Sequence, residues 1–280
     1  MRIADIFKEK RPVSFEIFPP KGELSMDSFR KTLSALSELS PDFISVTCSA
    51  GGSGGRDRTA SLAGIVRGEY GIEACAHLTC INSDAATLES DIEKIKENGI
   101  GNVLALRGDR IPGARTGAFR YAVDLMAKLC EEGFCIGGAC YPEGHIECSD
   151  PEKDLQYLYE KQQAGAEFFV TQLFFDNECF YRFLDKARNI GIHIPITTGI
   201  MPILSKAQIE RMIFTCGASL PSAIIRILNR YEDDPDALRK AGIEYAVRQI
   251  RDLWDNGVDG IHIYTMNRPQ IATEMVKGLK

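Results

Sequence analysis

A carboxylate lies inside one of the most apolar stretches of this chain. Glu16 stands between Phe15 and Ile17 in the run formed by residues 13–18. Burying a carboxylate among apolar neighbours is costly unless the group is paired, hydrated or used in chemistry. An apolar environment favours the protonated form, which is the form that a general acid needs. The sequence therefore predicts a proton-donating role for Glu16, and an ion-paired or surface glutamate is the alternative.

Other polar side chains stand at the carboxyl ends of apolar runs. They are Thr47, His77, Thr79, Arg107, Asp109, Tyr141, His145, Thr171, Gln172, Tyr264 and Arg268. In a parallel α/β barrel the carboxyl ends of all strands meet at one mouth, where active sites form. Together these residues predict a site that binds a polar organic cofactor, with one or two carboxylates for proton transfer.

Each of these signals also has a simpler interpretation. His77 could be a core histidine whose ring is satisfied by its neighbours, and Arg107 with Asp109 could form a salt bridge at the rim. The Gly-rich segment at residues 50–55 lacks the spacing of a phosphate-binding loop, so a flexible loop and a ligand loop are equally open. The rim histidines come without Cys or Asp at ligand spacing, so no metal site is predicted.

Eight apolar runs alternate with helix-like segments and would position these residues. They are residues 13–18, 43–48, 74–80, 102–107, 135–141, 168–174, 194–200 and 260–264. Six of them follow a helix-like segment that ends in Gly, which can take the left-handed conformation that closes a helix. The first seven are spaced by roughly 30 residues, the size of one βαβ unit. The sequence therefore predicts an α/β fold, a single (β/α)8 TIM barrel over residues 1–280, with extra helices between strands seven and eight.

Composition argues against several classes of partner. The chain has 280 residues, a formal net charge of −6 and no Lys/Arg-rich tract, so neither nucleic acid nor a membrane surface is an expected partner. Residues 1–10 are charged throughout and no apolar run approaches about 18 residues, so no signal peptide or membrane span is expected. Nine scattered cysteines without a Cys-x-x-Cys pair favour free thiols in a reducing compartment. A cytoplasmic location is expected.

Seven segments, taken in order along the chain, resemble the methylenetetrahydrofolate reductase family. They are SFEIFPP (14–20), SVT (45–47) with RDRT (56–59), HLTC (77–80), LALRGD (104–109), YPEGH (141–145), TQ (171–172) and YTMNR (264–268). The resemblance covers essentially the whole chain. It implies a flavin-dependent oxidoreductase of the bacterial catalytic-domain type, which reduces 5,10-methylenetetrahydrofolate to 5-methyltetrahydrofolate in one-carbon metabolism and methionine biosynthesis.

The resemblance also implies roles for particular residues. Glu16 matches the general acid that protonates N10 of methylenetetrahydrofolate and opens its five-membered ring. Asp109 matches the acid between the flavin and the pterin, where it would pair with the pterin and tune the flavin potential. Gln172 would bind folate and nicotinamide in turn, and Gln208 and Arg268 match positions near either substrate.

Flavin contacts are implied at a larger set of positions. These are Thr47, Ala50, His77, Arg107, Gly108, Asp109, Ala122, Tyr141, His145, Asp154 and Lys161. Arg107 would face the diphosphate of FAD, since a guanidinium fork suits phosphate oxygens. NAD(P)H would reduce flavin N5 and leave before the folate takes the hydride, which gives ping-pong kinetics. A homo-oligomer is expected, as is usual in this family.

Three residues depart from the family pattern. Tyr157 and Glu160 replace an Asn and an Arg near the diphosphate arm of FAD, so FMN is an alternative cofactor. Met212 replaces a Phe that covers folate or nicotinamide, so a redox partner subunit is an alternative source of electrons. Three other interpretations stay open at this point: a methyltransferase from methyltetrahydrofolate to a corrinoid protein, a relative of proline dehydrogenase, and a non-catalytic scaffold.

Overall fold

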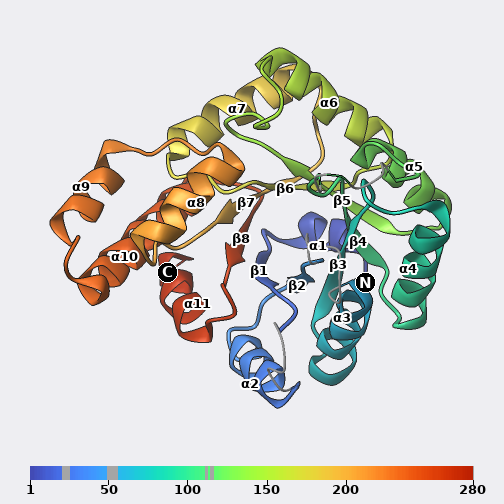
Figure 1. The fold of residues 1–280 in the computed structure, drawn as a ribbon, viewed down its shortest axis with the longest axis horizontal. Coiled ribbons are helices and arrows are strands. Elements are labelled where there is room, and N and C mark those ends of the chain that lie inside the picture. Colours follow the sequence, from blue (N-terminus) through green and yellow to red (C-terminus); the bar gives the residue numbers. More distant parts are fainter. Residues whose placement is uncertain (21–25, 49–55, 111–112, 114–116, 280) are drawn as a thin grey trace.

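The computed structural model describes residues 1–20, 26–48, 56–110, 113 and 117–279. Within these residues eight parallel strands close into a barrel in chain order, as Figure 1 shows. The strands are β1 (Val13–Ile17), β2 (Phe43–Val46), β3 (Glu73–Thr79), β4 (Asn102–Leu106), β5 (Cys135–Cys140), β6 (Phe168–Thr171), β7 (Ile196–Ile200) and β8 (Gly260–Tyr264). The predicted α/β class and the (β/α)8 barrel are confirmed.

Helices surround this barrel. They are α1 (Ile3–Glu9), α2 (Met26–Ser37), α3 (Arg56–Tyr70), α4 (Ala85–Glu97), α5 (Ala122–Glu131), α6 (Pro151–Gln163), α7 (Asn177–Asn189), α8 (Lys206–Cys216), α9 (Ser222–Arg230), α10 (Pro235–Asp255), α11 (Pro269–Met275) and the 3-10 helix η1 (Val276–Leu279). The extra helices predicted between strands seven and eight are confirmed as α8, α9 and α10. No helix of the described part combines the length and the hydropathy that crossing a membrane requires.

Six glycines end helices where the sequence predicts it. The backbone angle φ is positive, from 66° to 105°, at Gly71, Gly99, Gly133, Gly165, Gly191 and Gly257. A side chain disfavours this left-handed conformation, so glycine allows each helix to stop and the chain to turn back into the next strand. These stops fix where the following strands begin, and therefore where their carboxyl ends meet.

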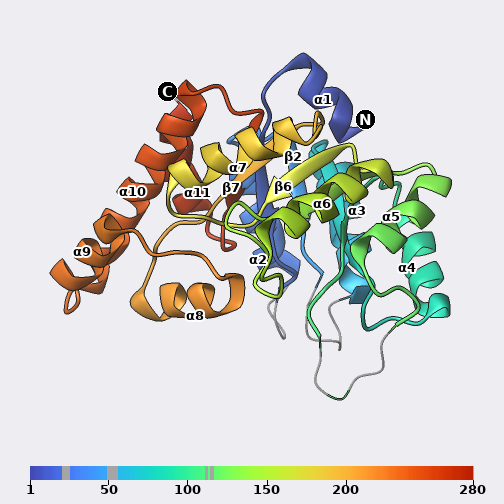
Figure 2. The ribbon, with the colours of Figure 1, turned by 90° about the horizontal axis from the view of Figure 1, so that it is seen from above.

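The barrel interior is apolar near the amino ends of its strands. Ile3 and Ile6 of α1 pack in one cluster with Phe43 and Phe168, which are buried inside the barrel. The side-chain oxygen of Asn102 accepts a hydrogen bond from the backbone of Ile3 at 2.8 Å and ties α1 to β4. Figure 2 shows α1 and α8 at opposite ends of the molecule. Helix α1 was not predicted from the sequence, and it closes the amino end of the barrel.

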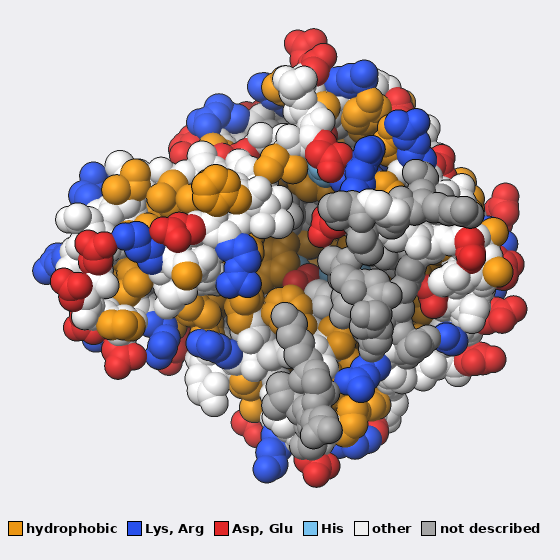
Figure 3. Space-filling view, viewed as in Figure 1, with side chains coloured by type: hydrophobic (Ala, Val, Ile, Leu, Met, Phe, Trp, Pro, Cys, Tyr) orange, Lys and Arg blue, Asp and Glu red, His pale blue; other side chains and the backbone are white. Residues whose placement is uncertain are grey.

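The interior becomes polar toward the carboxyl ends. Glu16 and His77 are buried in the carboxyl halves of their strands, and Ser14, Ser45 and His262 are buried nearer the middle. In the sheet register Glu16 lies opposite Ser45 of β2 on one side and opposite Tyr264 of β8 on the other. In the space-filling view the centre of one face is hollowed, with hydrophobic and acidic side chains visible in the hollow (Figure 3).

Candidate active site

Glu16 lies inside the barrel, as its sequence context predicts. It is 8% exposed and comes from the carboxyl half of β1. Its Oε2 atom lies 3.7 Å from Nε2 of His77 and 3.9 Å from Nε2 of His262. A carboxyl group enclosed by two imidazole rings at a barrel mouth is well placed to hold or give a proton.

His77 is a buried ring with an unused nitrogen. Its Nε2 atom has no hydrogen-bond partner within the described part of the chain. Burial lowers the pKa of His77 to about 4, with the nearby Glu16 opposing the shift and His262 adding to it. The ring is therefore neutral at neutral pH, and its contact with Glu16 is not a full ion pair. A buried polar atom without a partner usually has a functional reason, such as a ligand that supplies the missing hydrogen bond.

His262 is a site residue that the sequence analysis did not single out. It lies in the middle of β8 and is fully buried. Its Nδ1 atom lies 2.7 Å from the hydroxyl of Ser14, and its Nε2 atom lies 3.3 Å from the hydroxyl of Ser45. The sequence does contain a pattern that could have identified it. Side chains alternate between the two faces of a strand, and His262 is two residues before Tyr264, so both point to the same face.

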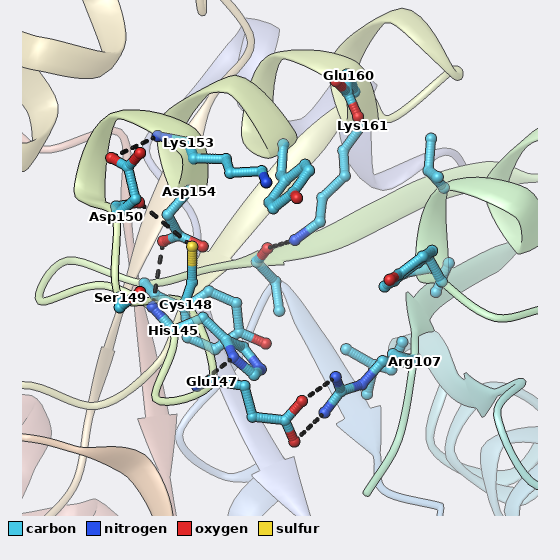
Figure 4. Close-up of a pocket in the computed structure, with 18 of the residues that line it drawn as sticks. Arg107, His145, Glu147, Cys148, Ser149, Asp150, Lys153, Asp154, Glu160 and Lys161 are labelled. Atoms are coloured by element: carbon cyan, nitrogen blue, oxygen red, sulfur yellow. Dashed lines mark hydrogen bonds and ion pairs between the residues drawn. The ribbon is translucent and has the colours of Figure 1, made fainter. Parts of the chain in front are cut away.

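A cavity of about 580 Å³ adjoins the carboxyl ends of β4 and β5, under α5 and α6 (Figure 4). Six of the predicted cofactor-binding residues line it together. They are Arg107, Ala122, Tyr141, His145, Asp154 and Lys161. A cavity of this size is large enough for a cofactor, since ligand pockets usually measure about 300–1,000 Å³.

The cation nearest the strand end in this cavity is already paired. Arg107 donates to Glu147 from both Nη1 and Nη2, at 2.6 and 2.9 Å, as the dashed lines in Figure 4 mark. Its Nε donates to the backbone oxygen of Gly108 at 3.2 Å. The hydrogen bonds to Glu147 raise the pKa of Arg107, and the same pair lowers the pKa of Glu147. Glu147 was not among the predicted site residues.

The opposite wall of the cavity combines a lysine, a tyrosine and a fixed loop. Lys161 donates to the backbone oxygen of Ala139 at 2.8 Å, and its ammonium lies 5.4 Å from the ring centre of Tyr141. Burial lowers the pKa of Lys161. The backbone of His145 donates to Asp154 at 3.2 Å, which anchors the loop after β5 onto α6. Burial raises the pKa of Asp154 and lowers that of His145, so this wall is drier than an open surface.

Other predicted flavin contacts lie near the mouth but outside this cavity lining. The backbone oxygen of Thr47 accepts from Thr59 at 3.0 Å. Gly108 has a φ of 84°, and a Cβ there would come within 2.9 Å of Thr79. The backbone oxygen of Asp109 accepts from Asn82 at 2.7 Å. Ala50 lies outside the described residues.

The three predicted folate or nicotinamide contacts differ in their surroundings. Gln172 follows β6, and its side-chain oxygen accepts from the backbone of Leu173 at 2.9 Å. Gln208 is buried, and its amide accepts from Leu204 and donates to the backbone of Pro202. Arg268 stands at the amino end of α11. In this structure the side chain of Gln208 stabilises the turn after β7, so a direct substrate contact would require these hydrogen bonds to be exchanged.

Metal ligation has no basis in the described residues. No three His, Cys, Asp or Glu side chains of the described part come together in a way that could hold a metal ion.

A closed parallel barrel that encloses a buried acid and has a cofactor-sized polar cavity at the carboxyl ends of β4 and β5 has the features of a cofactor-binding α/β-barrel enzyme. The chain belongs to the methylenetetrahydrofolate reductase family, whose sequence profile matches residues 2–280. This result confirms the resemblance and favours it over the methyltransferase, proline dehydrogenase and scaffold interpretations.

Individual relatives agree with the family match. Methylenetetrahydrofolate reductase 2 of Schizosaccharomyces pombe is 37% identical over 304 residues, which cover 99% of this chain and 47% of the relative. The 5,10-methylenetetrahydrofolate reductase of Escherichia coli is 35% identical over 261 residues, covering 93% of this chain and 88% of the relative. The chain thus spans about half the length of the yeast protein and most of the bacterial one.

A solved structure shares the fold at low sequence identity. It is an uncharacterised protein from Clostridium thermocellum, described as binding two copies of 5-methyl-5,6,7,8-tetrahydrofolic acid. The TM-score is 0.63 at 14% identity, covering 100% of this chain and 99% of that one. At this identity the likeness supports the barrel fold alone.

Proposed function

We propose that this chain is a methylenetetrahydrofolate reductase that uses a bound flavin to convert 5,10-methylenetetrahydrofolate into 5-methyltetrahydrofolate. The observation that carries the proposal is the position of Glu16, which is buried inside the barrel between two histidines, in a fold that also has a cofactor-sized cavity at the carboxyl ends of β4 and β5. The family match supplies the reaction. A folate ligand described for the Clostridium thermocellum neighbour is consistent with this substrate class.

The residues present fit a flavin. The unpartnered Nε2 of His77 offers a hydrogen bond to a polar ring edge, and two cations line the cavity: Lys161, and Arg107 in its pair with Glu147. FAD is the proposed cofactor; FMN is the alternative because Tyr157 and Glu160 both line the same cavity. When bound, the flavin would carry the hydride at N5 between donor and folate in alternation, which is the basis of ping-pong kinetics.

Side chains of the protein would supply the proton for the folate and would hold the folate in position. Glu16 would donate its proton to N10 of the folate, which opens the five-membered ring and makes its one-carbon unit an acceptor. The ring of His77, which burial keeps neutral, lies 3.7 Å from Glu16 and would leave its free Nε2 atom for a hydrogen bond to the bound ligand. Asp109 would orient the pterin, and Gln172 and Arg268 would contact folate or nicotinamide in turn.

The proposal extends to the partners of the enzyme. NAD(P)H is the proposed electron donor, with a redox partner subunit as the alternative. We also propose that the protein acts in the cytoplasm, in one-carbon metabolism leading to methionine, and that it assembles as a homo-oligomer.

An anaerobic absorbance titration tests the central claim. The flavin-loaded protein is titrated with 5-methyltetrahydrofolate, and the oxidised flavin band at roughly 450 nm is followed. Bleaching of that band is expected, because the reverse half-reaction reduces the flavin. A band that stays unchanged, with the flavin still bound, would contradict the proposal that flavin and folate share one site.

A further inference from the structure

Glu147 holds the guanidinium of Arg107 inside the cavity. Both oxygens of the carboxylate are engaged, one by Nη1 and one by Nη2. The Nε donor is taken by the backbone oxygen of Gly108. A phosphate group binds arginine best through two parallel N–H donors, and that pair of donors is occupied by a side chain of the protein itself.

The charges of the other lining residues do not compensate for the loss of Arg107 as an anion-binding group. The lining contains four basic side chains, Arg107, Arg110, Lys153 and Lys161. It also contains four acidic ones, Glu147, Asp150, Asp154 and Glu160. A phosphate-bearing ligand therefore enters a cavity without a formal excess of positive charge, and its best anion-binding group is already neutralised.

The carboxylate of Glu147 is free to leave while its backbone stays in place. Its backbone N–H donates to Nδ1 of His145 at 3.1 Å, and the backbone of His145 is in turn bound to Asp154. The side chain of Glu147 is 47% exposed, compared with 18% for Arg107. Rotation of this side chain would return the carboxylate to water, and a phosphate oxygen that took its place would replace one charge-assisted contact of Arg107 by another.

We propose that Glu147 occupies the anion-binding fork of Arg107 until a phosphate group of the cofactor replaces it, and that this competition sets the affinity of the cavity for phosphate-bearing flavins. The inference rests on the proposed function, since it takes the ligand of the cavity to be a flavin nucleotide. Glu147 is on this view a residue that weakens cofactor binding, although it is part of the cofactor site.

The test compares three flavins on one set of variants. The flavin-free full chain is titrated with FAD, FMN and riboflavin, and binding is followed by flavin fluorescence. Glu147→Gln is expected to lower the Kd for FAD roughly fivefold to tenfold, the order expected for one partly exposed charged contact. The Kd for riboflavin, which has no phosphate, should stay within about twofold. FMN shows which phosphate is involved. If the ribityl phosphate displaces Glu147, the Kd for FMN should fall as much as the Kd for FAD; if the second phosphate of FAD does, the Kd for FMN should stay as constant as that for riboflavin.

Two further variants separate competition at Arg107 from a general effect of charge. Glu160→Gln removes a carboxylate from the same cavity without touching Arg107, and its effect on FAD should be clearly smaller. In an Arg107→Gln background the Glu147→Gln change should have no further effect, because the two residues act as a pair. Equal tightening by Glu160→Gln, or an undiminished effect in the Arg107→Gln background, would overturn the inference.

The remaining outcomes of the flavin titrations also test whether Glu147 competes with the cofactor for Arg107. Unchanged or weaker FAD binding by a folded Glu147→Gln variant would mean that the carboxylate does not compete and instead orients the guanidinium. Thermal unfolding of each variant shows whether it is folded. If the wild-type chain binds none of the three flavins, the proposed function itself fails; if it binds FAD and Glu147→Gln changes nothing, only the inference fails.

Discussion

The carboxylate of Glu16 lies 3.7 Å from Nε2 of His77 inside the barrel, and the two side chains do not form a full ion pair at neutral pH. Burial keeps the pKa of His77 at about 4, so the ring stays uncharged. The Nε2 atom of this neutral ring has no hydrogen-bond partner within the described part of the chain, so a ligand bound beside Glu16 could complete it.

The first prediction concerns the two half-reactions of the proposed enzyme. Glu16→Gln should slow the reduction of methylenetetrahydrofolate by about a hundredfold to ten-thousandfold, the usual contribution of a general acid. Reduction of the flavin by NAD(P)H needs no proton from Glu16 and should be nearly unchanged. Stopped-flow absorbance measures the two steps separately, and Glu131→Gln on the exposed surface of α5 serves as the control. Survival of both half-reactions would mean that another group is the acid.

The second prediction concerns the stability of the flavin-free chain in acid. The pKa of His77 falls from 6.5 in the unfolded chain to about 4 in the folded protein. Between these values the unfolded chain binds the proton and the folded protein does not, so stability is full above pH 6.5 and falls as the pH drops toward 4. The loss from this one group is on the order of 3 kcal/mol. His77→Asn should reduce that loss when urea unfolding is compared at pH 7 and pH 4.5, and an unchanged loss would contradict the assignment.

The third prediction concerns the lysine that faces the arginine across the cavity. Lys161→Met removes one hydrogen bond to Ala139 and the ammonium above Tyr141, while it keeps an unbranched side chain of similar length. Binding of FAD should weaken by about tenfold, because one charge-assisted contact is lost. Lys153→Met is the matched control: this lysine also lines the cavity, but it is exposed, and its loss should matter less. Equal losses from the two variants would indicate a general charge effect.

The fourth prediction concerns the insertion between β7 and β8. Gly242 lies in the middle of α10, and a Cβ at this position would come within 2.1 Å of the backbone oxygen of Ile203. Gly242→Ala should therefore destabilise the fold by about 2–3 kcal/mol, since the helix would have to move away from the loop after β7. Gly68→Ala is the control, because a Cβ in that part of α3 meets nothing within 4 Å. That variant should be neutral or up to about 1 kcal/mol more stable.

Local signals predicted the barrel well because each unit repeats the same two features. An apolar run forms a buried strand, and a helix that ends in glycine sets where the next strand begins. The apolar run around Glu16 also predicted a covered strand, and the structure shows Glu16 buried in β1 rather than on the surface. Helix α1 was missed although Ile3 and Ile6 have helical spacing, because the charged residues around them dominated the interpretation.

Contacts between distant loops could not be predicted in the same way. Glu147 is 40 residues from Arg107 in the sequence, and their meeting depends on the path of the loop after β5. No local pattern records that path. The hydrogen bonds of Gln208 to the backbone of Pro202 and Leu204 were not predicted either, and the ligand contact that the family resemblance implies for Gln208 stays a prediction.

Helix α1 closes one end of the barrel. The apolar side chains of Ile3 and Ile6 fill that end, so a ligand can reach Glu16 only from the carboxyl end of the strands. Under the proposed function both substrates would reach Glu16 through that one opening. An excess of either substrate should then slow turnover by competing with the other for the same site.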